Sequence, residues 1–241
     1  MPSLTGSFPA CRRPRLSVCG LALGALLAVA TAPAAVPDYV REALGKFNPE
    51  VPAGWAYTLT TVRSEDARTT ARFDPSKPPA GQWTLLDFNG RAPTATESAQ
   101  YARTRAGGGN SSAPQGTFQK GDIDPASFTL ISEDADRGEF SCGFRAEATG
   151  ADKMLGHLRL RLTVNKRQPH VEKYVLELKE PYSPVLGVKM RELLVQMSFT
   201  PPAADRPSLP AVNSSHFLGR IFFIGMEENL TLTYSDLVRV Q

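Results

Sequence analysis

The chain has 241 residues, of which 41% are hydrophobic and 21% are charged. This composition is typical of a globular protein and excludes a chain that is disordered over most of its length. The 27 lysine and arginine residues nearly balance the 24 acidic residues. The composition therefore also argues against the strongly basic surface of a nucleic-acid-binding domain.

The N-terminus has the three-part layout of a secretory signal peptide. Arg12, Arg13 and Arg15 precede an apolar run, which is followed by small residues. The run of about fifteen residues is shorter than the roughly twenty that span a bilayer, which favours a cleaved signal over a membrane-anchoring helix. We predict a signal peptide over residues 1–34, cleavage after Ala34, and export to the periplasm of a Gram-negative bacterium.

Residues 35–241 are electrically neutral and contain a single cysteine. The predicted signal peptide holds three of the arginines and no acidic residue, so the rest of the chain carries 24 bases and 24 acids. A neutral chain has no overall positive field to attract nucleic acid or acidic lipid headgroups. Cys142 has no partner for an intramolecular disulfide, and its place in an alternating pattern predicts a buried, unreactive thiol. Val18 is too large to precede a lipidated Cys19, so we expect a soluble mature protein without a membrane span.

A helix and a strand meander are predicted at the start of this domain. The spacing of Val40, Ala43 and Leu44 is that of an amphipathic helix over residues 38–47. Alternating apolar residues then predict three strands, at residues 55–62, 68–73 and 82–88. An Asn-Gly pair at residues 89–90 predicts a turn after the third strand.

A second helix is predicted from Thr96 to Arg105. Thr94 and Glu97 have the spacing of a capping box at its start. Its apolar side consists of alanines with Tyr101, so this helix gains little free energy from burial. Two interpretations stay open, namely a lid that moves and a plain connector.

The region from Gly156 to Gln241 is predicted to form five strands, preceded by two others at residues 128–132 and 139–147. The first three of these five strands are predicted at residues 157–164, 173–179 and 191–199. Apolar and polar residues alternate along each of them, as expected for a sheet with one buried face.

The last two strands are less regular. Residues 217–225 are apolar on both faces, which predicts a strand covered on both sides, followed by a tight turn at residues 226–229 and a final strand. The proline-rich segment from Thr200 to Ser214 is long for a plain connection. We expect it to contact envelope proteins.

No motif for catalysis or metal binding is found. His157, His170 and His216 have no metal-ligand spacing, and the first two are expected to be solvated. No Gly-x-Ser-x-Gly nucleophile motif occurs, and the carboxylates at residues 133–136 and 227–228 lie beside turns, where charges normally face water. We predict that the protein is not an enzyme and uses no metal or cofactor; a hydrolase site assembled from distant loops is the weakest alternative.

The order of the predicted elements is itself informative. An export signal precedes a first helix, a strand meander, a helical insertion and a run of antiparallel strands that ends in Tyr-Ser-Asp-Leu at residues 234–237. The Val-Asn-Lys-Arg stretch at residues 164–167 is a second local feature. From residue 38 to residue 241 this layout resembles the LolA/LolB-like superfamily of periplasmic lipoprotein carriers. The resemblance implies an incomplete, strongly curved β-barrel whose open side is plugged by helices and whose apolar cavity holds acyl chains.

We therefore expect an α+β, mainly β domain over residues 35–241, with one strongly curved antiparallel sheet of about ten strands. Two or three helices should cover its concave side. The first functional hypothesis is a soluble periplasmic carrier or binder of lipid or lipoprotein acyl chains in a cavity under an openable helical lid. Its wall is predicted to include Trp55, Tyr57, Trp83, Leu160, Leu162, Tyr174, Leu176, Leu193, Val195, Met197 and Phe223. The alternative is that these residues form a closed core in a non-catalytic envelope scaffold or protein-binding module.

Overall fold

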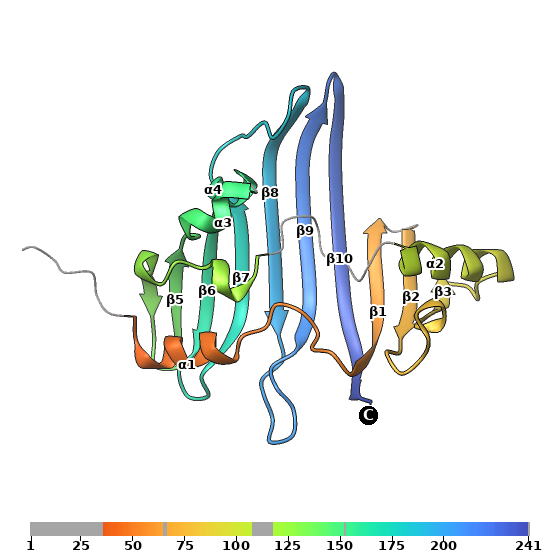
Figure 1. The fold of residues 1–241 in the computed structure, drawn as a ribbon, viewed down its shortest axis with the longest axis horizontal. Coiled ribbons are helices and arrows are strands. Elements are labelled where there is room, and N and C mark those ends of the chain that lie inside the picture. The colour runs from red at the N-terminus through yellow and green to blue at the C-terminus, as the bar shows by residue number, and fades with distance from the viewer. Residues whose placement is uncertain (1–35, 65–66, 108–117, 152, 241) are drawn as a thin grey trace, which may run out of the picture. The chain divides into compact units, whose positions relative to one another are not determined.

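A single antiparallel sheet organises the domain. The computed structural model describes residues 36–64, 67–107, 118–151 and 153–240, and the predicted signal peptide, residues 1–34, lies outside them. The ten strands are hydrogen-bonded in the order β3 (Trp83–Phe88), β2 (Ala67–Phe73), β1 (Trp55–Ser64), β10 (Ile224–Arg239), β9 (Pro210–Ile221), β8 (Val188–Phe199), β7 (His170–Leu178), β6 (Leu158–Asn165), β5 (Arg137–Cys142) and β4 (Thr129–Glu133) (Figure 1).

The two edge strands, β3 and β4, do not pair with each other, so the sheet is open rather than closed into a barrel. This arrangement confirms the predicted fold class of a curved, incomplete barrel of ten strands. The predicted meander is also confirmed, because β1, β2 and β3 are consecutive neighbours. Asn89 and Gly90 form the predicted turn after β3 with φ angles of 54° and 80°, the left-handed values that an Asn-Gly turn requires.

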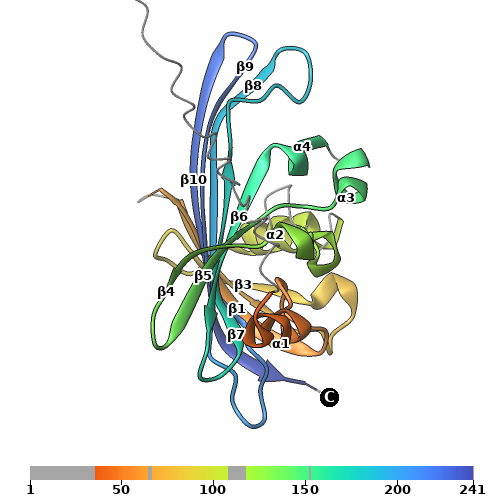
Figure 2. The same cartoon turned by 90° about the vertical axis from the view of Figure 1, so that its left-hand side faces the viewer.

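The α-helices of the described residues lie on one face of the sheet (Figure 2). The two predicted helices are present as α1 (Asp38–Lys46) and α2 (Ala95–Gly107). Two short helices, α3 (Ala146–Ala151) and α4 (Lys153–Gly156), were not expected. The predicted strand over residues 139–147 is too long, because the chain leaves the sheet after Cys142, where Arg145 donates its backbone N–H to the Asp122 carbonyl.

The five predicted C-terminal strands are confirmed as β6 to β10, but the last turn is elsewhere. The chain reverses at Phe222 and Phe223, so residues 217–221 belong to β9 and residues 224–229 to β10. The expected burial of residues 217–225 on both sides is wrong, because residues 220–225 are exposed. The strand β9 already begins at Pro210, which shortens the irregular loop to residues 200–209.

Alternation along the strands decides which side chains are buried. Directly paired residues of adjacent strands point to the same face, and Phe140, Leu162, Tyr174 and Met197 form one such row across β5, β6, β7 and β8. All four are at most 4% exposed. The intervening residues on the opposite face are charged, as where Arg161 lies 3.4 Å from carboxylates of both Glu139 and Glu177.

Two single-residue expectations have different outcomes. Cys142 is buried as predicted, and desolvation raises the pKa of its thiol to about 12, so the thiol stays protonated and unreactive. The expectation of a solvated His170 is wrong, because it is only 4% exposed. Its side chain folds back at the start of β7, and Nδ1 lies 2.6 Å from the Gln168 carbonyl oxygen.

We expect Leu162→Ala to lower the free energy of unfolding by about 2–5 kcal/mol, because it removes a fully buried side chain from the centre of the apolar face. The matched control is Leu130→Ala, which changes the same residue type in the same cross-strand row at the edge strand β4, where the side chain is 51% exposed. Its effect should stay within about 0.5 kcal/mol. Urea denaturation of both variants measures the difference, and equal effects would contradict the one-sided core.

Candidate ligand-binding face

The helix-facing side of the sheet carries two groups of buried apolar side chains. The first, called the α1 cluster, packs beneath α1 on β5 to β8 and includes Phe47, Phe118, Leu158, Leu160, Leu162, Val164, Tyr174, Leu176, Leu193, Val195, Met197 and Phe199. The second, called the α2 cluster, lies on β1, β2, β3 and β10 beside α2 and consists of Tyr57, Leu59, Ala71, Phe73, Trp83, Leu85 and Leu232.

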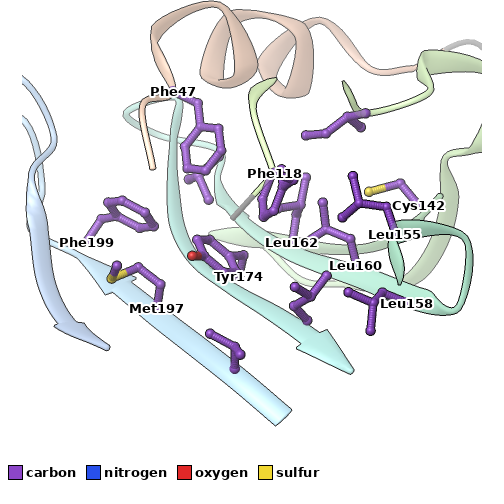
Figure 3. Close-up of a cluster of buried hydrophobic side chains, with 14 of the residues drawn as sticks. Phe47, Phe118, Cys142, Leu155, Leu158, Leu160, Leu162, Tyr174, Met197 and Phe199 are labelled. Atoms are coloured by element: carbon purple, nitrogen blue, oxygen red, sulfur yellow. The ribbon is translucent and has the colours of Figure 1, made fainter. Parts of the chain in front are cut away.

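Aromatic contacts organise the α1 cluster (Figure 3). Phe47, just beyond the end of α1, makes edge contacts with Tyr174 and Phe199, with ring centroids 6.3 and 5.4 Å apart. Phe118 contacts Tyr174 at 5.2 Å and also stacks on Phe47 at 6.4 Å between ring centroids. Tyr174 therefore lies at the point where α1, the segment around Phe118 and the sheet come together.

The α2 cluster has an aromatic centre of its own. Trp83 contacts Phe73 at 5.0 Å and Tyr57 at 5.9 Å between ring centroids. From α2, Tyr101 approaches Trp83 edge-on at 6.3 Å, and the Arg105 guanidinium lies 4.8 Å above the same indole ring. A cation over an indole is an attractive contact that survives in partly solvated positions, so α2 is attached to the sheet mainly through Trp83.

Tyrosine hydroxyls lie between the two clusters. Tyr57 and Tyr234 contact each other at 5.5 Å between ring centroids, and Tyr174 interacts electrostatically with Tyr234. Burial is the main cause that raises the pKa of all three, to about 12 for Tyr234. The hydroxyls are therefore neutral at physiological pH and offer hydrogen bonds rather than charge.

Two polar side chains interrupt the apolar face near its centre. Register places Met197, Asn213, Leu232 and Thr61 in one cross-strand row over β8, β9, β10 and β1. Asn213 is 3% exposed, and neither its Oδ1 nor Thr61 Oγ1 has a hydrogen-bond partner among the described residues. A buried acceptor left unsatisfied costs about 1–3 kcal/mol, so such atoms are normally paired with water or a ligand.

Ten of the eleven predicted wall residues are buried in the structure. Seven belong to the α1 cluster, and Tyr57 and Trp83 belong to the α2 cluster. Trp55 is buried but outside both clusters. Phe223 is not on this face at all: it is fully exposed in the β9–β10 turn, because the predicted strand runs past the residue at which the chain reverses.

We did not predict from the sequence that Phe118, Asn213 and Phe73 belong to this face. Phe118 follows no periodic pattern, so only the tertiary fold reveals its burial. Asn213 falls in the proline-rich segment over residues 200–214, whose sequence predicts a loop rather than a strand. Phe73 alternates with its neighbours in the predicted second strand, and that pattern could have identified it.

The two helices over this face are held in different ways. The α1 helix buries Val40 and Ala43 completely, and its Tyr39 donates a 2.8 Å hydrogen bond to the carboxylate of Glu133. Among the described side chains of α2, residues 95–105, none is buried. A helix that buries so little apolar surface gains little stability from packing.

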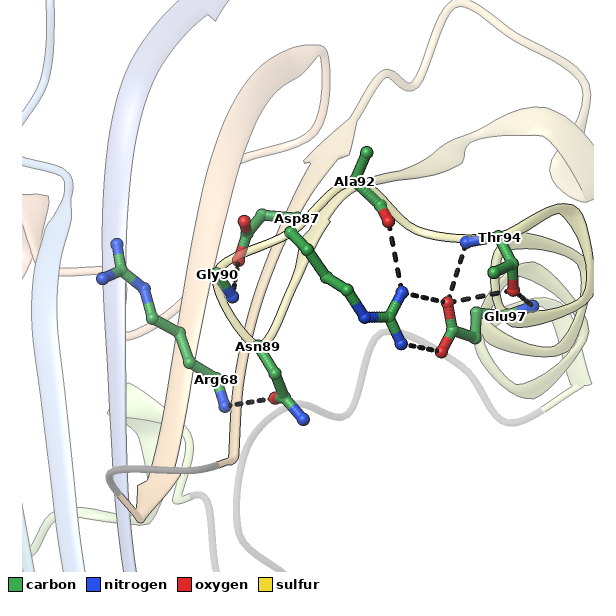
Figure 4. Close-up of polar contacts among 8 residues, drawn as sticks. Arg68, Asp87, Asn89, Gly90, Ala92, Thr94 and Glu97 are labelled. Carbon is green, nitrogen blue, oxygen red and sulfur yellow. Dashed lines mark hydrogen bonds and ion pairs between the residues drawn. The ribbon is translucent and has the colours of Figure 1, made fainter.

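Polar contacts at its first turn hold α2 instead (Figure 4). The Arg91 guanidinium donates two hydrogen bonds to the Glu97 carboxylate, at 2.9 and 2.6 Å. The predicted capping box is confirmed, since Thr94 N–H donates to Glu97 Oε2 at 2.8 Å and Glu97 N–H donates to Thr94 Oγ1 at 3.3 Å. The Arg91 hydrogen bonds are the main cause that lowers the pKa of Glu97 to about 2.

A depression near the β4–β5 hairpin is polar and differs in character from the apolar face described above. A depression of about 270 Å³ near the β4–β5 hairpin is lined by Ser132, Glu133, Asp134, Arg137, Glu139 and Thr163, and the exposed Glu133 pairs with Lys166 at 3.1 Å. Within the described part of the chain, no group of three or more His, Cys, Asp or Glu side chains is arranged to hold a metal ion. No helix among the described residues is both long and apolar enough to cross a membrane.

Acid should loosen α2 before the domain unfolds. The folded state depresses the Glu97 pKa from 4.5 to about 2, so this contribution to stability is present above about pH 4.5 and is lost as the pH falls towards 2. In a Trp55→Phe variant, Trp83 is the remaining tryptophan and reports contact with α2. Its emission should change between pH 4.5 and 2 while far-ultraviolet circular dichroism still shows the sheet.

The control for this prediction is Glu97→Gln in the same background. It should show the loosened emission already at pH 7 and a flatter acid profile. A Glu97→Gln variant indistinguishable from its parent at every pH would contradict the role of this carboxylate.

Comparisons with known proteins complete the description of this face. No protein-family model and no curated protein matches the chain. Among solved structures, the crystal structure of a LolA superfamily protein from Nitrosomonas europaea aligns with a TM-score of 0.39 and 12% sequence identity, over 84% of this chain and 92% of that chain. A likeness this distant assigns no role to any residue, so the function proposed below rests on the geometry of the sheet and its helices.

Proposed function

We propose that this protein is a non-catalytic carrier that binds an acyl chain of a lipid or lipoprotein against the helix-facing side of its sheet. The chain would lie over the α2 cluster, with α2 lifting to admit it. The predicted signal peptide supports action in the periplasm.

The observation that carries this proposal is the mismatch between α2 and the surface it covers. The α2 cluster presents Trp83, Tyr57 and Phe73, a surface that a permanent cover would match with large apolar side chains. None of the described α2 side chains is buried. A cover attached by an exposed cap, the partly buried Tyr101 ring and a cation–π contact opens at a lower free-energy cost than α1, which buries Val40 and Ala43.

Burial of the acyl chain would provide the binding free energy. Each methylene transferred from water to an apolar surface contributes about 0.8 kcal/mol. Because the α2 cluster is almost fully buried with α2 in place, entry requires α2 to move aside, and the bound chain replaces the contacts that α2 gives up.

The polar centre of the face supports a ligand that also carries a hydrogen-bond donor. Asn213 Oδ1 is a buried acceptor without a partner among the described residues. A lipid with an amide N–H or a glycerol hydroxyl satisfies it, and a plain hydrocarbon does not.

The direct test is native mass spectrometry of the protein after export in its own envelope, combined with displacement of a fluorescent fatty acid. We expect an acyl-bearing mass and displacement by long-chain lipids. A uniformly ligand-free mass together with no displacement would reject the carrier. That outcome would favour the alternative, a scaffold with a closed core, which the low exposure of both clusters supports.

Weakening the α2 cap should accelerate exchange of the bound chain. Thr94→Ala removes a cap worth about 1 kcal/mol, which corresponds to roughly fivefold faster release in a stopped-flow displacement assay. Asp38→Ala is the matched control, because it removes the Asp38–Arg41 pair from the first turn of α1. The control should leave the release rate unchanged, and equal acceleration by both variants would argue against α2 as the lid.

Asn213→Leu should separate ligand recognition from stability. It removes a buried amide whose Oδ1 is unsatisfied among the described residues, and it should raise the free energy of unfolding of the ligand-free protein by about 1 kcal/mol. We expect the unmodified protein to bind an N-acyl amino-acid methyl ester more tightly than a fatty-acid methyl ester of equal chain length. The Asn213→Leu variant should lose this preference. Competition assays on both proteins measure that preference, and its persistence in the variant would exclude Asn213 as the acceptor.

A further inference from the structure

The β9–β10 hairpin and the loop between β7 and β8 form one apolar tip. The strands β8, β9 and β10 extend beyond the others, and the tip lies at their far end (Figures 1 and 2). Val188 pairs with Ile221, and Phe222 N–H donates to the Gly187 carbonyl at 2.5 Å. Segments far apart in the sequence are thus joined into one structural unit.

The tip exposes an unusual concentration of large apolar side chains. Phe223 is 100% exposed, Leu186 98%, Ile224 71%, Phe222 65% and Val185 61%. Single exposed apolar residues are common on soluble proteins, but a contiguous group of them marks an interaction site. This group lies at the end of the sheet, and none of its five residues belongs to the two clusters that form the core.

The backbone holds the tip in a conformation that its sequence does not favour. Phe222 adopts a φ of 52°, where a hairpin turn normally has glycine or asparagine. Its ring lies against Gly187, where an added Cβ would come within 2.7 Å of a ring carbon. Phe222 is therefore fixed by the neighbouring loop, and Phe223 is left pointing into solvent.

Basic residues lie next to the apolar tip, and the acidic residues of the same strands lie further from it. Residues 181–191 and 219–226 contain Lys189, Arg191 and Arg220 and no acidic residue. Lys189 and Arg220 are directly opposite each other across β8 and β9, an arrangement that is destabilising unless an anion lies nearby. The acidic residues nearest the tip on these strands are Glu192 and Glu227. Both pair with Leu218 of β9, which lies further from the turn than Arg220.

We propose that this tip inserts into the surface of an anionic phospholipid membrane. At about 3.4 Å per residue, Arg220 lies about 7 Å from the turn and the row of Leu218 about 14 Å. An apolar element buried about 5–10 Å into the headgroup boundary would place Arg220 and Lys189 at the phosphates and the acids outside them. The positive charge of Arg220 and Lys189 attracts the lipid phosphates locally, although residues 35–241 are neutral overall.

Flotation of the full, exported protein with lipid vesicles tests the proposal. We expect binding to vesicles of phosphatidylglycerol and phosphatidylcholine, and at least tenfold weaker binding to phosphatidylcholine alone. Leu186→Ser/Phe223→Ser should lose at least tenfold of the anionic-vesicle binding, and both positions are fully exposed, so the fold is retained. Ile131→Ser, at a 49% exposed apolar position on β4, is the control and should bind as the unmodified protein does.

Two further variants locate the contact and its charge dependence. Lys189→Gln/Arg220→Gln should remove the preference for anionic vesicles while retaining weak binding. Phe223→Trp adds a fluorophore at the tip, and lipids brominated on their acyl chains should quench its emission. The emission of Trp55 and Trp83, both buried, gives the baseline.

Several outcomes would overturn the proposal. They are no binding to anionic vesicles, equal binding by the Leu186→Ser/Phe223→Ser variant, and no quenching in the Phe223→Trp variant. A dimer that dissociates in Phe223→Ser, without vesicle binding, would assign the tip to contact with a second copy of the chain instead. Displacement of a fluorescent fatty acid should be unaffected by the tip variants, so the membrane contact and the acyl carrier fail independently.

Discussion

The rest of the structure depends on one constraint, namely that an open antiparallel sheet has a continuous apolar face that must be covered. The strands alternate, so Leu160, Leu162 and their neighbours all point to one side, and charged pairs such as Arg161 with Glu139 occupy the other. A closed barrel would cover its own interior. Here the edges β3 and β4 remain apart, and helices, together with the segment around Phe118, cover the face instead.

The cover is unequal, and this inequality is the basis of the proposed function. The α1 helix is part of the core, since Val40 and Ala43 are inaccessible to solvent and Phe47 joins the aromatic contacts around Tyr174. The α2 helix is held by Glu97 and Arg91 at its start and by Arg105 over Trp83 near its end. Such polar, exposed contacts are individually weak and depend on pH and salt. Under the proposed function, these weak contacts would let α2 uncover its cluster at low free-energy cost, as loading and release require.

Departures from ordinary packing rules coincide with the proposed contacts. Asn213 leaves an acceptor unsatisfied in an otherwise apolar row, Phe222 adopts a left-handed backbone conformation, and Lys189 faces Arg220 across the sheet. The Asn213 acceptor and the Lys189–Arg220 pair are unfavourable in the isolated protein and would become favourable beside the proposed partners, a ligand donor and an anionic lipid surface, respectively. The Phe222 conformation is a local steric cost at the base of the exposed tip. Natural sequences tend to keep such local conflicts where they serve a function.

The sequence by itself determined that the domain is mainly β with one-sided antiparallel strands, and it also determined the α2 capping box and the burial of Cys142. These features follow from local periodicity and spacing, which act over a few residues, whereas the open, curved form of the sheet was implied by the resemblance of the layout to a known superfamily. The tertiary structure alone decided that the last hairpin reverses at Phe222 and Phe223, which moved Phe223 from the expected cavity wall to an exposed tip. It also decided that His170 is buried and that Asn213 lies in the apolar row. The reason is physical: an apolar stretch such as residues 217–225 satisfies a strand pattern in several registers, and only pairing with both β8 and β10 selects one of them.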